Sequence, residues 1–377
     1  MNNKTIHFNQ PYISKNTKNN LLKVLSNKKF SDGEFQIKTE KYIEKLIHSN
    51  SIKLTQSCSS ALEVCMILAD IKKGDEVIIP SYTFTSTANC VLLRNAKPVF
   101  ADINKNDLNI SIESIKKKIN KKTKAIIIVH YAGIACDMDK LLQLKKKYNL
   151  LIIEDAAHAF YGKYKNKYLG TIGDLGAFSF HESKNILGGQ CGALSINNLK
   201  FLKRANIILD KGTDRSYQIN KKFYSWKDVG SEYRAPELSA ALVYSQLKDI
   251  KIIQSKRSLI WNRYYDSFKK IKKKKFSILT YDFKIIKNTF HIFCLIFNNI
   301  KIRKKFINFM RERNIFCNFH YYPLHISTLG RKFSNDKLIN TNKAYNGLVR
   351  LPIYPNLSLK YQKKIIESVH SFLKKID

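Results

Sequence analysis

Lys184, in the stretch FSFHESKN, is the residue whose position points most directly to chemistry. It follows a short apolar run that is typical of a buried strand, so its amine is expected to be partly removed from water. Desolvation lowers the pKa of a lysine, and a lysine needs a lowered pKa to form a Schiff base with a carbonyl group. Taken alone, the position fits an ordinary surface lysine better, because lysine is abundant in this chain.

Asp155 ends the apolar run LLIIED, which precedes Lys184 in the chain. A carboxylate at the end of such a strand could pair with the protonated ring nitrogen of pyridoxal 5'-phosphate (PLP). That pairing keeps the ring electron-poor, so that the ring can accept the electrons of a substrate carbanion. The alternative is that Asp155 caps a helix that begins at AAHAF.

The segment TQSCSSALE could bind the phosphate group of such a cofactor. Small hydroxyl residues stand directly before a predicted helix, and the N–H groups at a helix start bind anions. Ser179, in the strand before Lys184, could add a hydroxyl group. Ordinary helix capping explains the serines equally well when they are taken alone, but together the three segments offer the contacts that PLP needs.

The elements that must position these residues alternate between strands and helices. Helices are expected at 61–70 and 139–148, where apolar residues recur among charged ones. The alternation predicts an α/β fold with a mostly parallel sheet, in which ligands bind outside the carboxyl ends of the strands. The expected strands are 53–56, 76–79, 98–101, 125–130, 150–155, 177–180 and 192–196.

The sequence pattern changes near residue 250. A long basic helix is expected over 250–275, followed by two strand-like segments, TFHIFCLIF and NIFCNFHYYPL, and by a final helix over 361–375. This pattern predicts a large domain over 1–250 and a smaller α+β domain over 251–377. No linker-like stretch separates them, so we expect the two domains to pack closely.

The formal net charge of +38 raises nucleic-acid binding as a hypothesis from a different class. The lysines are spread along the whole chain, and isoleucine and asparagine are also abundant, as a coding bias toward A and T would produce. We therefore prefer an enzyme whose diffuse positive field attracts an anionic small molecule. Whether the excess charge lies on one face is the observation that separates the two readings.

The cysteines and the first residues of the chain indicate the cellular compartment. The seven cysteines are odd in number and include no C-x-x-C pair, which argues against a disulfide framework or a zinc ribbon. The sequence contains no run of about eighteen apolar residues, so no membrane span is predicted. The polar start, MNNKTIHFNQPYISKN, lacks the apolar stretch of a signal peptide, so a cytoplasmic location is expected.

The ordered segments TQSCSSALE, PSYTFTSTAN, HYAGIACDMD, IEDAAHA, FSFHESKN, KGTDRS and FHYYPLH resemble the sugar aminotransferases of the DegT/DnrJ/EryC1/StrS family. The resemblance runs from PYISKN to LPIYPNLS, almost the full chain. It implies the PLP-dependent transferase fold of type I, similar to aspartate aminotransferase. It also implies PLP as cofactor, glutamate and a nucleotide sugar as substrates, and a homodimer with shared active sites.

The resemblance implies a role for each matching residue. Lys184 would carry the cofactor and act as the base that moves the proton, and Asp155 would hold the ring nitrogen. His158 would approach the ring hydroxyl group, and Phe84 would stack on the ring, with core packing as the alternative for Phe84. The phosphate donors would be Ser59, Ser60 and Ser179.

The substrate side of the site is expected to include His320 and Tyr321, which lie in the family's H-Y-x-P-L-H segment. His130 and Tyr131 are expected to line the pocket as well. Each of these four residues could instead be a buried aromatic side chain that only packs in the core.

Within the family, HYAGIACDMD and KGTDRS are most similar to the branch that makes dTDP-4-amino-4,6-dideoxy-D-galactose for enterobacterial common antigen. The expected reaction moves an amino group from glutamate to C4 of dTDP-4-keto-6-deoxy-D-glucose. An aminotransferase of different regiochemistry or stereochemistry is the nearest alternative. PLP-dependent dehydration on the same scaffold replaces the lysine by histidine, so Lys184 argues against it.

Two positions depart from the family pattern. Many relatives have G-E-G-G after the lysine, whereas this chain has Gln190 and Cys191 in a shorter loop, which puts the local geometry in doubt. Relatives often place an asparagine where this chain has Arg234, within GSEYRAPEL. The asparagine reaches the phosphate held by the partner subunit. The arginine could bind that phosphate as a charged donor, or it could point to solvent.

Overall fold

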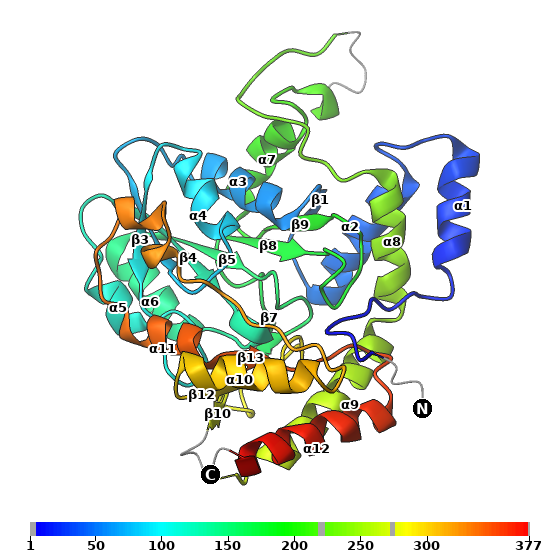
Figure 1. Ribbon diagram of the computed structural model, residues 1–377. Helices are drawn as coiled ribbons and strands as arrows, with labels where there is room; N and C mark the ends of the chain where they lie inside the picture. The colour runs from blue at the N-terminus through cyan, green and yellow to red at the C-terminus, as the bar shows by residue number, and fades with distance from the viewer. Residues whose placement is uncertain (1–4, 218–222, 272–275, 376–377) are drawn as a thin grey trace.

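The computed structural model describes residues 5–217, 223–271 and 276–375 of the chain (Figure 1). Its centre is a seven-stranded sheet with the strand order β1-β9-β8-β5-β4-β2-β3. Only β9 runs antiparallel to its neighbours, so the expectation of a mostly parallel sheet is confirmed. The strands are β1 (Ile52–Thr55), β2 (Glu76–Pro80), β3 (Lys97–Ala101), β4 (Thr123–Val129), β5 (Leu151–Asp155), β8 (Leu175–Ser179) and β9 (Gly192–Ile196).

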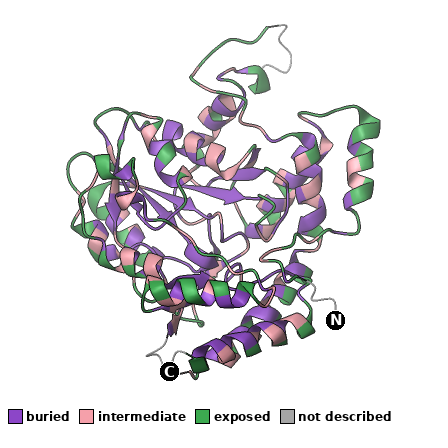
Figure 2. Cartoon of the chain, viewed as in Figure 1, coloured by how far each residue is buried: buried purple, intermediate pink, exposed green. Residues whose placement is uncertain are grey.

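The sheet is covered on both faces, which explains why its strands are almost continuously apolar. In β4, Ile126 and Ile128 belong to one buried cluster, whereas Ala125 and Ile127 belong to another on the opposite face. Figure 2 shows the strands as the buried centre of the molecule. The helices of this part of the chain, of which α1 packs on the outside of α8, are α1 (Thr17–Asn27), α2 (Glu34–Ile47), α3 (Cys58–Leu68), α4 (Ser86–Leu92), α5 (Ile112–Lys116), α6 (Met138–Tyr148), α7 (Leu202–Leu209) and α8 (Glu237–Lys248).

The parallel register brings the functional strand ends to one edge. Val129, the last residue of β4, is paired with Asp155, the last residue of β5, and Asp155 is paired with Ala177 of β8. Side chains that follow these strands therefore meet at the carboxyl edge of the sheet. This is the edge at which open α/β sheets bind ligands.

The last third of the chain builds a smaller three-stranded antiparallel sheet, in the order β10-β12-β13, with its own apolar cluster. Ile6, from the N-terminal segment, completes that cluster, so the two ends of the chain pack together there. The division at residue 250 stays a prediction, although α8 ends at Lys248 directly before the next helix. The elements are α9 (Ile250–Phe268), β10 (Phe276–Ile278), β12 (Cys294–Phe297), α10 (Ile300–Arg311), α11 (Ile339–Gly347), β13 (Leu348–Arg350) and α12 (Leu359–Lys375).

Two expectations for this part of the chain were wrong in detail. The helix expected over 250–275 ends at Phe268, and residues 272–275 lie outside the described part of the chain. The segment NIFCNFHYYPL contains no named strand and makes only isolated bridges at Ile315 and Asn318. Its apolar residues suggested a strand, but its histidine and tyrosine side chains line a pocket and its backbone follows that wall.

Short elements complete the described fold. A third, small sheet joins β11 (Ile286–Lys287), β6 (Lys163–Tyr164) and β7 (Lys167–Tyr168), and so ties the last third of the chain to the first part. Among the described helices, none combines the length and the apolar character that crossing a bilayer requires. The 3₁₀ turns are Tyr131–Gly133, Leu199–Phe201, Arg215–Tyr217, Leu324–Ile326 and Gly330–Lys332.

Candidate active site

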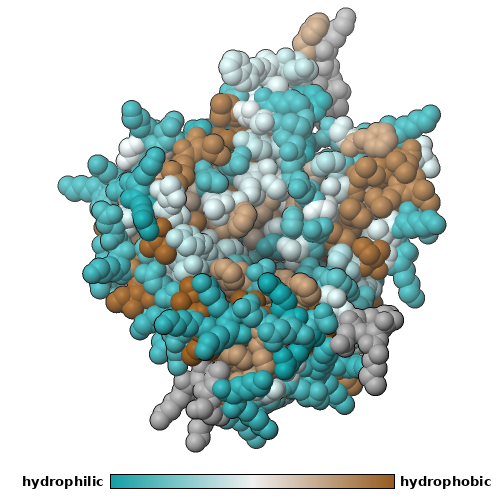
Figure 3. Space-filling view, in the orientation of Figure 1, coloured by the Kyte–Doolittle hydropathy of each residue, from teal (hydrophilic) through white to brown (hydrophobic). Residues whose placement is uncertain are grey.

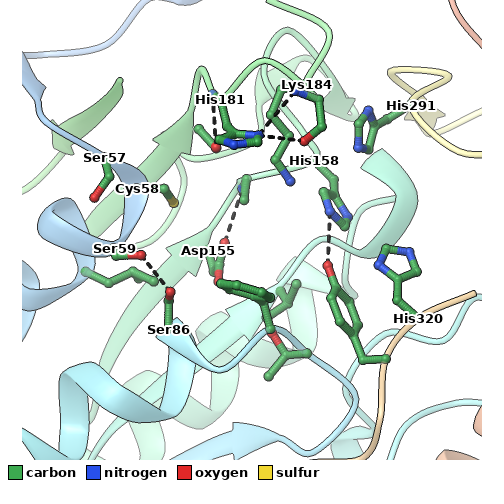
Figure 4. Close-up of a pocket in the computed structure, with 18 of the residues that line it drawn as sticks. Ser57, Cys58, Ser59, Ser86, Asp155, His158, His181, Lys184, His291 and His320 are labelled. Carbon is green, nitrogen blue, oxygen red and sulfur yellow. Dashed lines mark hydrogen bonds between the residues drawn. The ribbon is translucent and has the colours of Figure 1, made fainter. Parts of the chain in front are cut away.

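A cavity of about 580 Å³ opens at the carboxyl edge of the large sheet. Side chains from the first two-thirds of the chain form one wall, and side chains from the last third form another. Of the residues expected from sequence, Lys184, Asp155, His158, Phe84, Ser59, Ser179, His320 and Tyr321 line this cavity. Figure 4 shows Ser57, Ser59 and Ser86 on one side of Lys184 and His158, His291 and His320 on the other.

Lys184 lies in the turn after β8, where its backbone N–H donates to the carbonyl of His181 at 2.8 Å. Its amine points into the space between Asp155 and His158 (Figure 4). Burial lowers the pKa of Lys184 to about 8; the charge of Arg350 adds to the lowering, while Cys58 and Asp155 oppose it. About a tenth of this amine is therefore neutral at pH 7, far more than for an ordinary lysine, and the neutral form is the one that Schiff-base chemistry requires.

Asp155 is the buried last residue of β5, and both of its carboxylate oxygens are engaged. The hydroxyl of Thr87 donates to Oδ2 at 2.9 Å, and the backbone N–H of Ala157 donates to Oδ1 at 3.2 Å. Burial raises the pKa of Asp155, whereas these two hydrogen bonds lower it. The alternative role as a helix cap was wrong, because no helix follows Asp155 and residues 157–161 form turns.

The serine-rich segment begins α3, as expected. Ser57 is the N-cap, and its hydroxyl accepts a hydrogen bond from the backbone N–H of Ser60 at 3.0 Å. Ser57 and Ser59 line the cavity together with Ser86, whose hydroxyl lies 2.6 Å from that of Ser59. Ser60 does not line the cavity, because its N–H and hydroxyl groups are both directed at Ser57.

A glycine allows the neighbouring strand to approach this helix start. A Cβ atom on Gly192 would lie 2.4 Å from the backbone nitrogen of Cys58. The first residue of β9 must therefore lack a side chain if β9 is to pack against the start of α3. The preceding residues Gln190 and Cys191 both line the cavity, the first exposed and the second buried.

Neutral histidines gather on the side of the cavity opposite the serines. The hydroxyl of Tyr321 lies 3.2 Å from Nε2 of His158, and the His158 and His291 rings are 4.7 Å apart. Burial lowers the pKa of His158, His291 and His320 below that of an exposed histidine. Nδ1 of His158 is buried and has no hydrogen-bond partner among the described residues, so it is available to a ligand.

Phe84 lies at the mouth of the cavity and is 59% exposed. Its ring is 6.4 Å from that of Tyr321, which belongs to the opposite wall. The core-packing alternative for Phe84 is therefore wrong, because an exposed ring contributes little to a core. A flat ligand seated between the two walls would cover this ring.

Besides Ser60, three expected site residues do not line the cavity. His130 is fully buried and is bound through Nε2 to Glu154 at 2.8 Å, so its side chain belongs to the core. Tyr131 lies behind the cavity wall, with its ring 5.9 Å from that of His320. Arg234 is paired with Asp32 at 3.0 Å, away from the cavity of its own chain.

Several residues that line the cavity were not predicted from the sequence, and Arg350 is the most important of them. Its guanidinium group lines the cavity from the end of β13. The available signal was a single charged residue in the apolar run LVRLPIYP. Other lining residues that were missed include Phe8, Asn9, Thr83, Ser86 and His291.

The residues of the cavity fit PLP. An amine with a pKa of about 8 stands beside a buried carboxylate, as attachment of the aldehyde and pairing of the ring nitrogen require. The start of α3, with Ser57 and Ser59, has the kind of donor groups that suit the cofactor phosphate. The unpartnered Nδ1 of His158 offers a further polar contact. No group of three His, Cys, Asp or Glu side chains in the described part of the chain is arranged to hold a metal ion.

Comparison with known proteins agrees with this chemistry. Residues 11–370 match the model of the DegT/DnrJ/EryC1/StrS aminotransferase family, and the chain belongs to that family. It is 30% identical to the spore coat polysaccharide biosynthesis protein SpsC of Bacillus subtilis over 387 residues, which cover 100% of this chain and 99% of SpsC. It is 29% identical to the GDP-perosamine synthase of Escherichia coli O157:H7 over 340 residues, 88% of this chain and 89% of that protein.

The fold is likewise that of solved aminotransferases. Helicobacter pylori PseC, an aminotransferase of pseudaminic acid biosynthesis, superposes with a TM-score of 0.91 at 26% identity, over 99% of this chain and 100% of PseC. Similar structures include a PLP form and a pyridoxamine phosphate form. The expected type I fold, the aminotransferase class and the PLP cofactor are thereby confirmed.

Proposed function

We propose that this enzyme transfers an amino group from glutamate to the C4 ketone of a nucleotide-linked 4-keto-6-deoxy hexose. The observation that carries the proposal is Lys184, whose amine has a pKa of about 8 and reaches between Asp155 and His158. The serine-bearing helix start and the neutral histidines surround it. The family to which the chain belongs supports a sugar as the amino acceptor.

The side chains divide the work as follows. Bound PLP supplies an electron sink, which makes a hydrogen on the reacting carbon acidic. Lys184, neutral in part at physiological pH, takes that proton and returns it at the neighbouring position. Asp155 holds the ring nitrogen in its protonated form, and Thr87 holds Asp155 in place. His158 and Tyr321, one from each wall, form a hydrogen-bonded pair on the side of Lys184 away from the serines, where they orient the ligand.

The sugar we propose first is dTDP-4-keto-6-deoxy-D-glucose, with dTDP-4-amino-4,6-dideoxy-D-galactose as the product. The segments HYAGIACDMD and KGTDRS support this branch, and with it a role in enterobacterial common antigen synthesis. A GDP-linked sugar is the second candidate. It is favoured by the similarity to two GDP-perosamine synthases, from Escherichia coli O157:H7 and from Vibrio cholerae.

The proposal includes a homodimer with shared active sites. Exposed apolar residues support it: on one side of the space-filling view they gather over α1 and α8 (Figure 3). In a dimer, Arg234 would reach the cofactor phosphate held by the partner subunit, after release from Asp32. The exposed apolar residues of this region include Leu22, Leu25, Phe30, Ile37 and Leu238.

We propose the cytoplasm as the compartment. All seven cysteines are free, and Cys65, Cys90 and Cys136 are among those that are buried in the core. Reduced, isolated thiols of this kind suit a reducing compartment.

The decisive experiment offers the PLP-loaded protein glutamate together with either the dTDP-linked or the GDP-linked 4-keto-6-deoxy sugar. We expect an amino sugar, and NMR assignment of the C4 configuration identifies the product. An axial amine on the dTDP sugar supports the first candidate, and product from the GDP sugar alone supports the second. An equatorial amine on the dTDP sugar contradicts the first candidate.

A matched pair of variants tests the role of Lys184. Lys184→Ala should lose the visible absorbance that borohydride bleaches in the native protein, and turnover should fall by about 10³-fold or more. Lys146→Ala, at an exposed position of α6, should behave as the native protein does. A native protein without cofactor absorbance, but with tight and salt-sensitive DNA binding, would overturn the enzyme proposal in favour of a nucleic-acid-binding protein.

A further inference from the structure

Asn185 follows Lys184 directly in the chain and fixes the protonation of a histidine in the cavity. Its Nδ2 donates to the carbonyl of Thr289 at 2.8 Å, and its Oδ1 lies 2.9 Å from Nδ1 of His291. A backbone carbonyl only accepts, so the amide nitrogen must face Thr289 and the amide oxygen must face His291. His291 therefore carries a proton on Nδ1, because Oδ1 of Asn185 requires a donor.

The second nitrogen of His291 is a bare acceptor that faces the cavity. Burial lowers the pKa of His291, and His158 and Lys184 lower it further, so the ring is neutral and has a single proton. With that proton on Nδ1, Nε2 keeps its lone pair. The described residues offer no hydrogen-bond donor to Nε2, which is accessible from the cavity that the ring lines. The ring lies on the same side of Lys184 as His158 (Figure 4).

The backbone around His291 is held in place from two directions. The buried Arg257 of α9 donates to the carbonyls of Phe290 at 3.1 Å and His291 at 2.8 Å. The hydroxyl of Thr289 donates to the carbonyl of His158 at 2.7 Å, and the rings of His158 and His291 are 4.7 Å apart. An acceptor that is fixed before the ligand arrives loses little entropy when the ligand binds.

A bare nitrogen is unsuited to most groups that the cavity must hold. The carboxylates of an amino acid donor, the diphosphate of a nucleotide sugar and the ketone oxygen at C4 offer only acceptor atoms, which the lone pair of Nε2 repels. The ionised ring oxygen of the cofactor is an acceptor as well. Two donors remain, namely the amine that is transferred and a hydroxyl group of the sugar.

The position of Lys184 favours the hydroxyl group. The amine of Lys184 marks where the nitrogen is exchanged, and it makes no hydrogen bond to His291 among the described residues. The partner of Nε2 therefore lies beyond the reacting nitrogen. In a 4-keto-6-deoxy hexose, C4 has two ring neighbours, of which C3 carries a hydroxyl group and C5 carries a methyl group. The C3 hydroxyl is thus the donor nearest to the reacting carbon.

We propose that Nε2 of His291 accepts a hydrogen bond from the C3 hydroxyl group of the keto sugar, and that Asn185 fixes the tautomer that this bond requires. This inference rests on the proposed sugar aminotransferase function. His291 then selects sugars that retain the C3 hydroxyl group, and Asn185 links that selection to the turn that carries Lys184. Glutamate has no hydroxyl group, so its reaction makes no use of Nε2.

The two half-reactions of the holoenzyme are measured separately. The PLP form is mixed with L-glutamate, and the pyridoxamine phosphate form is mixed with dTDP-4-keto-6-deoxy-D-glucose or its GDP-linked counterpart; each conversion is followed by its absorbance. In His291→Phe, the second-order rate constant of the sugar half-reaction should fall by about tenfold, as expected for a hydroxyl group buried without its partner. The glutamate half-reaction should change by less than about threefold.

A sugar that lacks the hydroxyl group separates this contact from a structural effect. With the native enzyme, the 3-deoxy analogue should react about tenfold more slowly than the parent sugar. With His291→Phe, the two sugars should react at rates within about threefold of each other. His291→Gln places an acceptor near the position of Nε2 and should recover part of the preference. His7→Phe, at an exposed position of the N-terminal segment, is the matched control.

The tautomer can be observed without turnover. In the PLP-free protein with isotope-labelled histidine, the nitrogen NMR signals that are missing from His291→Phe belong to His291. They should show a protonated Nδ1 and a bare Nε2. In Asn185→Leu, the preference for this tautomer should be lost.

The outcomes are distinct. If the native enzyme converts no keto sugar, the proposed function fails. If it does convert one, but shows no preference for the C3 hydroxyl group or keeps that preference in His291→Phe, the function stands and the role of His291 is overturned. Equal losses in both half-reactions would assign Nε2 to the transferred amine and also overturn the inference, as would a proton on Nε2 in the native protein.

Discussion

The hydroxyl group of Thr87, on α4, donates a hydrogen bond of 2.9 Å to Oδ2 of Asp155 at the end of β5. This contact joins a helix to the one buried carboxylate that lines the cavity among the described residues. Because burial favours the protonated form of Asp155 and the hydrogen bond favours the ionised form, Thr87 keeps the carboxylate available to a cationic ring nitrogen.

Replacing Thr87 by valine tests that role while preserving the shape of the side chain. Loss of the donor should raise the pKa of Asp155 further, so activity should be lost at a higher pH as the solution is acidified. At neutral pH, we expect kcat/KM to fall by about tenfold, the effect of one hydrogen bond to a charged group. Thr85→Val, at an exposed position of the same segment, is the control. An unchanged pH profile would contradict the assignment.

The pKa of Lys184 predicts how the PLP-free protein takes up its cofactor. Only the neutral amine attacks the aldehyde, so the rate of covalent uptake should rise as the pH increases and level off above about pH 8. A stopped-flow series between pH 6 and pH 10 measures the rate of uptake. The pH at which the rate reaches half of its maximum should be about 8. A rate that is still rising toward the ordinary lysine value of 10.5 would show that Lys184 is not desolvated.

The same shift has a consequence for stability. Lys184 has a lower pKa in the folded protein than in the unfolded chain. At pH values between these two pKa values, the unfolded chain therefore binds more protons. The contribution of Lys184 to the free energy of unfolding of the PLP-free protein should therefore increase as the pH rises through that window. Comparing the native protein with Lys184→Met by denaturant unfolding at several pH values isolates this contribution.

Glu154 is expected to stabilise the core, together with His130. The fully buried Glu154 carboxylate accepts hydrogen bonds from the backbone N–H groups of Gly170 at 2.7 Å, Ile172 at 2.6 Å and Gly173 at 2.5 Å, and from His130. In Glu154→Gln, the free energy of unfolding should fall by about 2–4 kcal/mol, because the amide cannot satisfy these donors equally.

Thermal and urea unfolding measure this loss, with the exposed Glu113→Gln as control. The glutamate half-reaction of the folded fraction should keep its rate within about threefold. If Glu154→Gln were stable but bound substrate poorly, His130 would regain its expected place in substrate binding.

Gln190 should prove tolerant of replacement by the glutamate that many relatives carry. The residue is exposed at the cavity mouth, and no described side chain is hydrogen-bonded to it. A carboxylate there would be screened by solvent, so we expect Gln190→Glu to change the glutamate and sugar half-reactions by less than about threefold. A larger gain in rate would show that the shortened loop limits the native enzyme.

The strand pattern could be predicted from sequence because each strand of the large sheet is nearly continuously apolar. The strand ends then located Lys184, Asp155 and the serines at one edge. Side-chain direction could not be predicted in the same way: His130 also follows a strand, yet its ring turns inward to Glu154. Ser60 was misplaced for a similar reason, because its donor group is consumed in capping its own helix.

Arg350 could not be placed from sequence because its position depends on contacts between distant segments. Its strand is short, and its register is set by β12 and by Asn318. Phe8, from the other end of the chain, supports its guanidinium. Local periodicity carries no information about such contacts, and the segment around His320 was misread as a strand for the same reason.

The two walls of the cavity come from different stretches of the chain. Lys184, Asp155 and the serines belong to the first stretch, whereas His320, Tyr321 and Arg350 belong to the last. A chimaera that joins residues 1–250 of this protein to the last third of a relative would keep the cofactor wall and exchange the wall opposite. Cofactor binding and substrate specificity would then come from different parents of the chimaera. New specificities could therefore arise by recombination within the family while the catalytic lysine stays unchanged.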